Sequence, residues 1–204
     1  RVTRLGCMLA ALAFLVFSPH VAERSFSADL TSQTAPSAAQ PIHAVWVEAQ
    51  SAELRSRKDC EKMIEHLRDM NVDDVFVEVR RLGDAYYRSS LAPAPAGLPA
   101  DFADPLGAIL ETAHRPKARP MRVHAVMDLF HLYNDALPLE APKEHMLKLH
   151  PEWLSRDFMG NTRDKDRNVY LDPGVPAVQD YLTSLVAELV TAYPVDGVHF
   201  SNFR

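Results

Sequence analysis

Glycine is scarce in this chain of 204 residues, which has 7 glycines against 15 prolines, although proteins on average use glycine somewhat more than proline. The first predicted strand is followed by Glu48-Ala49-Gln50-Ser51 and not by a glycine-rich phosphate loop. A dinucleotide-binding fold usually carries its phosphate loop at that position. The sequence therefore disfavours a nucleotide cofactor.

Cysteine is rarer still, since the chain has only Cys7 and Cys60. Cys7 lies near the start of the first apolar run and not after it, in a poor position for a lipid anchor. Cys60 has no cysteine partner beyond that run and no neighbours at metal-ligand spacing. We interpret Cys60 as a structural residue of a helix.

An excess of basic residues is also missing. The chain has 22 Lys and Arg against 27 Asp and Glu, a formal charge of −5, and its lysines and arginines form no block. Proteins that bind nucleic acid concentrate positive charge on one surface. Nucleic acid is thus excluded as an expected partner, and a composition of 47% hydrophobic and 24% charged residues indicates a globular protein.

The N-terminal apolar run, residues 5–17, is too short for a comfortable membrane span. Arg1 and Arg4 precede it, and a Ser-Pro break and small residues follow it, which is the layout of a secretory signal peptide. We expect residues 1–28 to be this signal. The protein would then be exported to the periplasm or the cell exterior, with no stable membrane span after signal removal.

Residues 29–41 are small, polar and interrupted by proline, which predicts a flexible linker. Beyond it, β-prone runs alternate with amphipathic helical stretches. The expected strands cover residues 42–47, 75–79, 121–127 and 195–200, and the expected helices cover 59–70, 104–114 and a long stretch from Pro176. Strands separated by helices pair in parallel, so the fold class is α/β. A doubly wound sheet and a (β/α)8 TIM barrel both fit, and the missing phosphate loop favours the barrel.

Alternate residues of a barrel strand point inward, and the last of them emerge at the carboxyl-terminal mouth, where barrel enzymes keep their chemistry. The three valines of residues 74–80 would then face the helices. The expected inward or strand-end residues are polar in each strand: Glu48, Glu78, Arg80, His124, Asp128, His199 and Ser201. Any one of them is as readily a structural residue as a functional one. Their recurrence over four strands favours a functional site.

Two chemistries suit such a set of residues. Paired carboxylates hydrolyse a glycosidic bond, one as proton donor and the other as nucleophile or base. Alternatively, a cluster such as His124, Asp128 and His131 holds a divalent metal for hydrolysis. The metal hypothesis is weaker because His131 lies beyond the strand and no His-x-His pair accompanies it. We expect no metal and no other cofactor.

Several segments, in this order, resemble the glycosyl hydrolase-like 10 family of exported bacterial proteins: VWVEA, VFVEVRRLGDAYY, DPLGAILETAH, VHA, HPEWL, YLDPGVPAVQDYL and YPVDGVHF. The resemblance covers about residues 42–204, and LDPGVP and YPVDGVHF are its most specific parts. It implies a TIM barrel whose members are thought to cleave cell-envelope glycans, including peptidoglycan strands.

By position, Arg80 and Asp84 match the family's R-x-x-G-D-A pattern, and His124 matches the histidine of its third strand. Asp172 matches the first residue of a D/N-P-G element, where a turn or helix-capping role is the better interpretation.

The chain departs from the family at the end of the fourth strand. Ser201 and Asn202 stand where the family usually has Asp and then Asp or Tyr, and neither can supply a carboxylate. Glu78 stands where the family often has Gln, which could restore one carboxylate. These departures put catalysis in doubt and leave the fold expectation unchanged.

We therefore predict an exported glycoside hydrolase-like protein that acts on a cell-envelope polysaccharide, with Glu78 and Asp84 as the catalytic carboxyls. The expected substrate-binding residues are Glu48, Arg80, Tyr87, His124, Asp128, Trp153, His199, Ser201 and Arg204. The alternative is a non-catalytic glycan-binding relative or fragment. Residues 42–204 fall short of the roughly 250 residues of a typical barrel, so we expect only the first four β/α units.

Overall fold

The computed structural model describes residues 41–99, 101–116, 118–137 and 141–202. The expected signal peptide and nearly all of the expected linker lie outside the described residues, as does Arg204, so those expectations stay predictions. From Pro41 onward the chain forms one compact unit. In this described part, no helix combines the length and the apolar character needed to cross a membrane.

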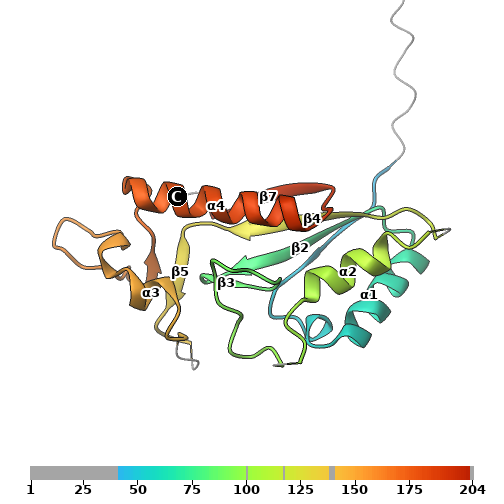
Figure 1. Cartoon of the computed structure of the whole chain (residues 1–204), viewed down its shortest axis with the longest axis horizontal. Coiled ribbons are helices and arrows are strands. Elements are labelled where there is room, and N and C mark those ends of the chain that lie inside the picture. The colour runs from blue at the N-terminus through green and yellow to red at the C-terminus, as the bar shows by residue number, and fades with distance from the viewer. Residues whose placement is uncertain (1–40, 100, 117, 138–140, 203–204) are drawn as a thin grey trace, which may run out of the picture. The chain divides into compact units, whose positions relative to one another are not determined.

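A parallel sheet is the centre of the fold (Figure 1). Its strands pair in the order β1-β2-β4-β7 and have the bounds Ala44–Val47, Asp74–Arg81, Arg122–Asp128 and Gly197–Ser201. A two-residue strand, β3 (Asp84–Ala85), turns back antiparallel to the end of β2. The α/β class is thus confirmed, and each of the four expected strands is present with ends shifted by no more than a few residues.

Three helices connect these strands: α1 (Arg57–Asp69), α2 (Pro105–Ala113) and α4 (Pro176–Ala192). Side chains cap the first two, because Ser56 accepts a hydrogen bond from the Asp59 amide and Asp104 accepts one from the Gly107 amide. Proline occupies the first turn of α2 and α4, where its missing N–H group is not needed. Cys60 lies fully buried on α1, as expected of a structural residue.

The two faces of the sheet differ in burial. One face carries six side chains that are at most 1% exposed: Val75, Val77, Val79, Val123, Ala125 and Met127. On the opposite face Trp46, Phe76 and His124 lie level with one another in the strand register and stack, with ring centroids 5.9 Å and 4.6 Å apart. Trp46 remains 48% exposed. The valine face is therefore the core, and the aromatic face is open among the described residues.

Further short elements lie between β4 and α4, and the sequence did not predict them. An antiparallel pair is formed by β5 (His131–Asn134) and β6 (Asn168–Tyr170). Two helical turns, α3 (Met146–Leu149) and η2 (Pro151–Trp153), lie between these strands in the chain. The segment between β1 and α1 adds a 3-10 turn, η1 (Ala52–Leu54). These elements are too short to show a clear hydrophobic period.

Candidate functional site

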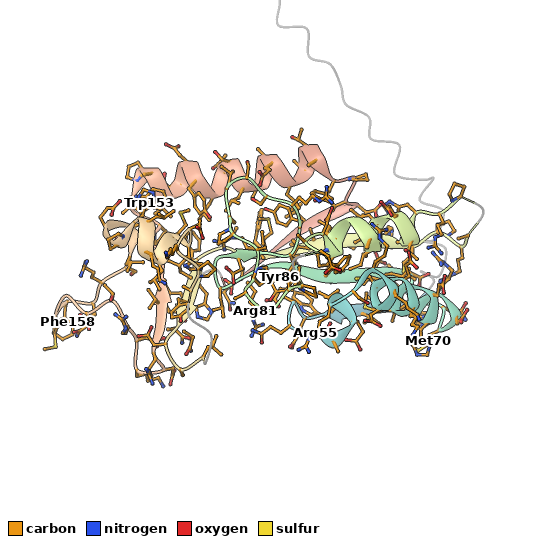
Figure 2. The ribbon with its side chains drawn as sticks, turned by 60° about the horizontal axis from the view of Figure 1, so that its bottom comes forward. Arg55, Met70, Arg81, Tyr86, Trp153 and Phe158 are labelled. Atoms are coloured by element: carbon orange, nitrogen blue, oxygen red, sulfur yellow. The ribbon has the colours of Figure 1, made fainter. Side chains whose placement is uncertain are left out.

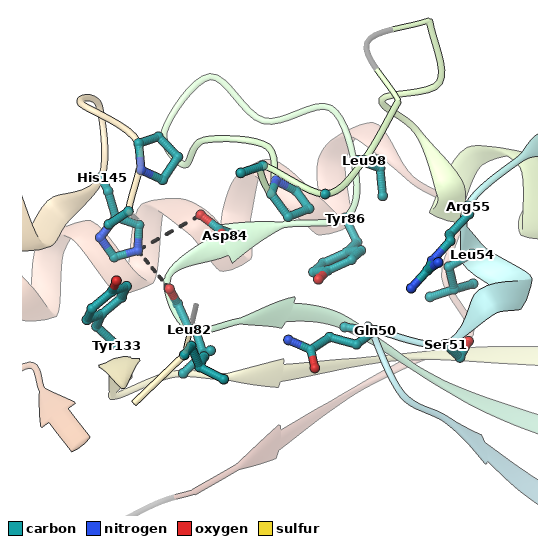
Figure 3. Close-up of a pocket in the computed structure, with 17 residues that line it drawn as sticks. Gln50, Ser51, Leu54, Arg55, Leu82, Asp84, Tyr86, Leu98, Tyr133 and His145 are labelled. Atoms are coloured by element: carbon teal, nitrogen blue, oxygen red, sulfur yellow. Dashed lines mark hydrogen bonds and ion pairs between the residues drawn. The ribbon is translucent and has the colours of Figure 1, made fainter. Parts of the chain in front are cut away.

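A cavity of about 370 Å³ lies beyond the carboxyl-terminal ends of β1 and β2 (Figure 3). Its wall is formed by the segment after β1, by the β2–β3 turn, by a proline-rich loop and by the segment around β5. The lining residues are Ala49, Gln50, Ser51, Leu54, Arg55, Leu82, Asp84, Tyr86, Pro95, Ala96, Gly97, Leu98, Tyr133, Leu137, Ala141, Pro142 and His145. Parallel α/β proteins place their ligand sites at this end of the sheet. This cavity is the candidate functional site.

Asp84 is the only carboxyl among the described residues that line the cavity. A tight turn delivers it: Leu82 and Gly83 have φ values of 50° and 82°, and Asp84 then pairs with Arg81 across the turn. Its Oδ1 atom is buried and receives no hydrogen bond in the described structure. Burial raises the pKa of Asp84 to about 7, although the positive charge of Arg80 opposes the shift. Asp84 can therefore hold a proton near neutral pH and donate it.

His145 lies beside Asp84 and is 1% exposed. Its Nδ1 atom accepts a hydrogen bond from the Leu147 amide, so the proton of the ring is on Nε2, which donates to the Leu82 carbonyl across 2.7 Å. Burial lowers the pKa of His145, so the ring is neutral. Nε2 is 3.9 Å from Asp84 Oδ1, beyond hydrogen-bond range. No spacing of residue types marks His145 in the sequence, and it was not among the predicted site residues.

Glu78, the other predicted catalytic carboxyl, is buried but is not among the cavity-lining residues. Its Oε2 atom accepts a hydrogen bond from the Ala49 amide at 2.9 Å and forms an ion pair with Arg81 at 3.2 Å. Because Ala49 lines the cavity, Glu78 holds one wall in place from behind. The structure thus brings Glu78 and Asp84 to the same end of the sheet in different surroundings.

Arg80 does not share a face with Glu78, and that expectation was wrong. A register shift between the two residues pairs Glu78 with Val126 but Arg80 with Met127, whose side chain belongs to the core face. Arg80 is completely buried and donates to the carbonyl groups of Asp128 and Leu129. It therefore holds the end of β4 and has no exposed surface with which to contact a substrate.

His124 lies at the opposite end of the sheet from the cavity. The expectation that each strand brings its polar residues to the same end of the sheet was therefore wrong for His124. Its Nε2 atom is 2.7 Å from Oδ1 of Asp74, the first residue of β2. Arg122 also binds Asp74, through two hydrogen bonds of 2.7 Å and 2.6 Å that lower the pKa of the carboxyl. The amino-terminal end of parallel strands is usually a stabilising region.

The alternative metal cluster is not assembled either. Asp128 lies near His131, with 3.5 Å between carboxylate and ring, but His124 is at the other end of β4. His199 packs edge-on against Trp46 on the open face of the sheet. No group of three or more potential metal-ligating side chains was found where the structure describes the chain.

Asp128 and Ser201 do lie at the carboxyl-terminal ends of their strands, and they are partners in the β4–β7 register. Asp128 is 2% exposed and accepts hydrogen bonds from the Asn202 side chain and the His131 amide. Glu48 follows β1 and is exposed. Asp172 accepts a hydrogen bond from the Gly174 amide, as a turn residue does.

The two predicted aromatic contacts are packed against other rings. Tyr87 is 1% exposed and lies edge-on to Tyr193. Trp153 stacks on His150, with ring centroids 3.9 Å apart, and lies near α4 in Figure 2, where Tyr181 is 5.6 Å from it. Tyr87 is thus a core residue, while Trp153 keeps part of its surface accessible.

Solved structures of sugar-cleaving enzymes contain a similar arrangement of parallel strands and helices. Comparison with solved structures supports this fold. A maltogenic α-amylase, AmyB from Thermotoga neapolitana, is similar at a TM-score of 0.51 and 20% identity over 80% of this chain and 40% of that chain. A chitobiase from Flavobacterium johnsoniae is similar at 0.51 and 14% over 78% and 23%.

The chain belongs to the glycosyl hydrolase-like 10 family, whose sequence profile matches residues 41–204. It is 27% identical over 201 residues to glycosyl hydrolase DigH of Escherichia coli K12, covering 83% of this chain and 43% of DigH. It is 24% identical over 149 residues to glycosyl hydrolase YngK of Bacillus subtilis, covering 70% of this chain and 27% of YngK. The matched part is thus less than half of either relative.

Proposed function

We propose that this chain is part of an exported glycoside hydrolase that cleaves a cell-envelope polysaccharide, with peptidoglycan glycan strands as the first candidate. One observation carries the proposal: a part-buried carboxyl, whose Oδ1 atom has no hydrogen-bond partner and whose pKa is raised to about 7, lines a cavity at the carboxyl-terminal ends of the strands. The family and the names of the relatives support the reaction class. The choice of glycan rests on the resemblance alone.

In this mechanism Asp84 is the general acid. Glycosidases protonate the leaving oxygen with one carboxyl, kept neutral by its surroundings, while a second carboxylate acts as nucleophile or activates water. Asp84 would give its proton to the glycosidic oxygen and become a carboxylate, which recovers a proton from water. Glu78 would keep the Ala49 wall in place through its hydrogen bond to the amide.

The second carboxylate is proposed to come from elsewhere in a complete barrel. In this proposal the four parallel strands are the first half of a (β/α)8 barrel. The exposure of Trp46 on the open sheet face and the 43% coverage of DigH both support it. Parallel sheets normally have both faces covered.

A second candidate is glycan binding without hydrolysis. It is favoured by Ser201 at the end of β7 and by the presence of one carboxyl, Asp84, among the described cavity-lining residues. Such a protein would bind glycan strands and release no reducing ends.

The test is to incubate the complete protein that contains this chain, and so also the proposed second carboxylate, with purified peptidoglycan glycan strands and to measure both new reducing ends and co-sedimentation. The matched variants are Asp84→Asn and, as control, Asp69→Asn, which changes an exposed aspartate of α1. We expect release by the parent and by Asp69→Asn, and a loss of about 100-fold or more in Asp84→Asn. Binding without release would replace hydrolysis by the second candidate, and neither binding nor release would overturn both.

Export is proposed from the layout of residues 1–28. A fusion of residues 1–41 to a phosphatase that is active only outside the cytoplasm tests it. Activity of the fusion, lost when the apolar run is interrupted by charged residues, is the expected result. An inactive, unprocessed fusion would contradict export by this segment.

A further inference from the structure

The β2–β3 turn is held by a residue from a distant part of the chain. The Nε2 atom of His145 donates to the carbonyl oxygen of Leu82, two residues before Asp84, and a dashed line marks this bond in Figure 3. We propose that His145 is a positioning residue of the site, which holds the turn so that the Asp84 carboxyl stays unpaired at the cavity wall. This inference rests on the proposed function, because it assigns His145 to the support of the proposed proton donor.

Two hydrogen bonds fix the imidazole in one tautomer. The Leu147 amide donates to Nδ1 at 3.2 Å, which leaves Nε2 as the ring donor toward Leu82. If the ring flipped, the Leu147 amide and the Leu82 carbonyl would both lose their hydrogen-bond partners. The direction of the Leu82 carbonyl is therefore set by His145.

Gly83 is what allows the imidazole to come so close. Its φ of +82° is a conformation that side-chain-bearing residues rarely adopt, and a Cβ atom at this position would lie 2.4 Å from His145 Nε2 and 2.9 Å from Leu132 Cδ1. The glycine of the R-x-x-G-D-A pattern thus serves the contact with His145.

The charge of His145 decides what Asp84 can do. The other titratable groups that face the carboxyl are Arg80 from β2, Tyr86 beyond β3 and Tyr181 from α4. An imidazolium 3.9 Å from Oδ1 would stabilise the ionised form of Asp84 and lower its pKa, so that the carboxyl would lose its proton to water. A buried, neutral imidazole in that place supports the turn without stabilising the carboxylate.

The experiment is a ¹³C NMR titration of the Asp84 carboxyl in the full chain, which needs no substrate. His145→Gln keeps an N–H donor near the position of Nε2, whereas His145→Leu keeps comparable bulk without a donor. We expect the pKa of Asp84 to stay near the parent value in His145→Gln. In His145→Leu we expect it to fall by about one pH unit or more, because the freed turn carries the carboxyl toward water. His150→Gln is the control on the same segment, since His150 bonds Glu152 instead, and it should leave Asp84 unchanged.

Equal Asp84 titrations in the glutamine and leucine variants, whether high or low, would overturn the proposal. If the leucine variant does not fold, the ¹⁵N spectrum of His145 in the parent decides: the neutral Nε2–H tautomer at pH 7 is expected, and an imidazolium or the Nδ1–H tautomer would overturn it. If the chain shows the expected titrations but the complete protein that contains it hydrolyses no glycan, the proposed function is overturned and the positioning role is retained.

Discussion

The side-chain amide of Asn202 donates a hydrogen bond to the carboxylate of Asp128 across 2.9 Å, and so joins the end of β7 to the end of β4. Asp128 is 2% exposed, so its charge depends on neutral and donating neighbours. The resembled family usually has an aspartate or a tyrosine where this chain has Asn202. The amide therefore stabilises a buried carboxylate at a position where a second carboxylate would repel it.

Replacing Asn202 with aspartate should destabilise the protein at neutral pH. Two carboxylates at this distance would repel each other, and the repulsion disappears at low pH, where carboxyl groups are protonated. We expect a loss of about 1–3 kcal/mol in the free energy of unfolding at pH 8, measured by urea denaturation, and little loss at pH 4. Asn202→Gly is the control, because it removes the amide and tolerates the φ of 52°. Identical behaviour of the two variants at pH 8 would show that repulsion is not involved.

Asp84 should make the stability of the parent depend on pH. The folded-state pKa of about 7 lies above the ordinary aspartate pKa of 3.8, so the folded protein binds a proton that the unfolded chain has released. Raising the pH through this window lowers the free energy of unfolding, by up to about 4 kcal/mol in total. Asp84→Asn has no charge to bury. Its free energy of unfolding, relative to that of the parent, should therefore rise by that amount between pH 4 and pH 8. Urea denaturation across this range, with Asp69→Asn as control, would contradict the account if all three curves were parallel.

Arg80 should prove to be a structural residue. Arg80→Met removes the donors to two buried carbonyl groups, and we expect a loss of about 2–4 kcal/mol in the free energy of unfolding. Arg81→Met, which changes a half-buried neighbour, should lose about 1 kcal/mol or less. Glycan binding by folded Arg80→Met, measured by co-sedimentation, should match the parent. If Arg80→Met were as stable as the parent but bound glycan more weakly, Arg80 would be a substrate-binding residue instead.

Gly197 should be intolerant of a side chain. A Cβ atom there would lie 2.5 Å from His124 Nδ1, so Gly197→Ala must displace the ring that bonds Asp74. Overpacking of this kind costs about 1–3 kcal/mol. Gly97→Ala, with no atom within 4 Å of the added Cβ, should stay within about 0.5 kcal/mol of the parent. If His124→Ala does not reduce the cost of Gly197→Ala, the contact is not its source.

The parts of the fold that the sequence could predict are those with repeated burial. Val75, Val77 and Val79 recur at every second position and are buried on one face, and Asp104-Pro105 marks the start of α2. The strands β5 and β6 span only a few residues, and their pairing depends on contacts between distant segments. Local patterns carry no information on such pairing.

The candidate site was predictable only in part. Asp84 was found through its motif, and the structure places it at the cavity wall. The register shift that turns Arg80 into the core depends on carbonyl groups 48 and 49 residues away. His145 joins Asp84 through the backbone of Leu82, 63 residues earlier in the chain. Neither relationship leaves a trace in the spacing of residue types.

The pH dependence of glycan cleavage by the parent and by Asp84→Asn tests the central claim most directly. The claim is that Asp84 donates the proton to the leaving oxygen, which requires its protonated form. Reducing-end release from glycan strands should persist below pH 7, fall as the pH rises through the pKa of about 7, and drop by about 100-fold or more in Asp84→Asn at every pH. An Asp84→Asn variant that cleaves as fast as the parent, with the same pH profile, would contradict the account.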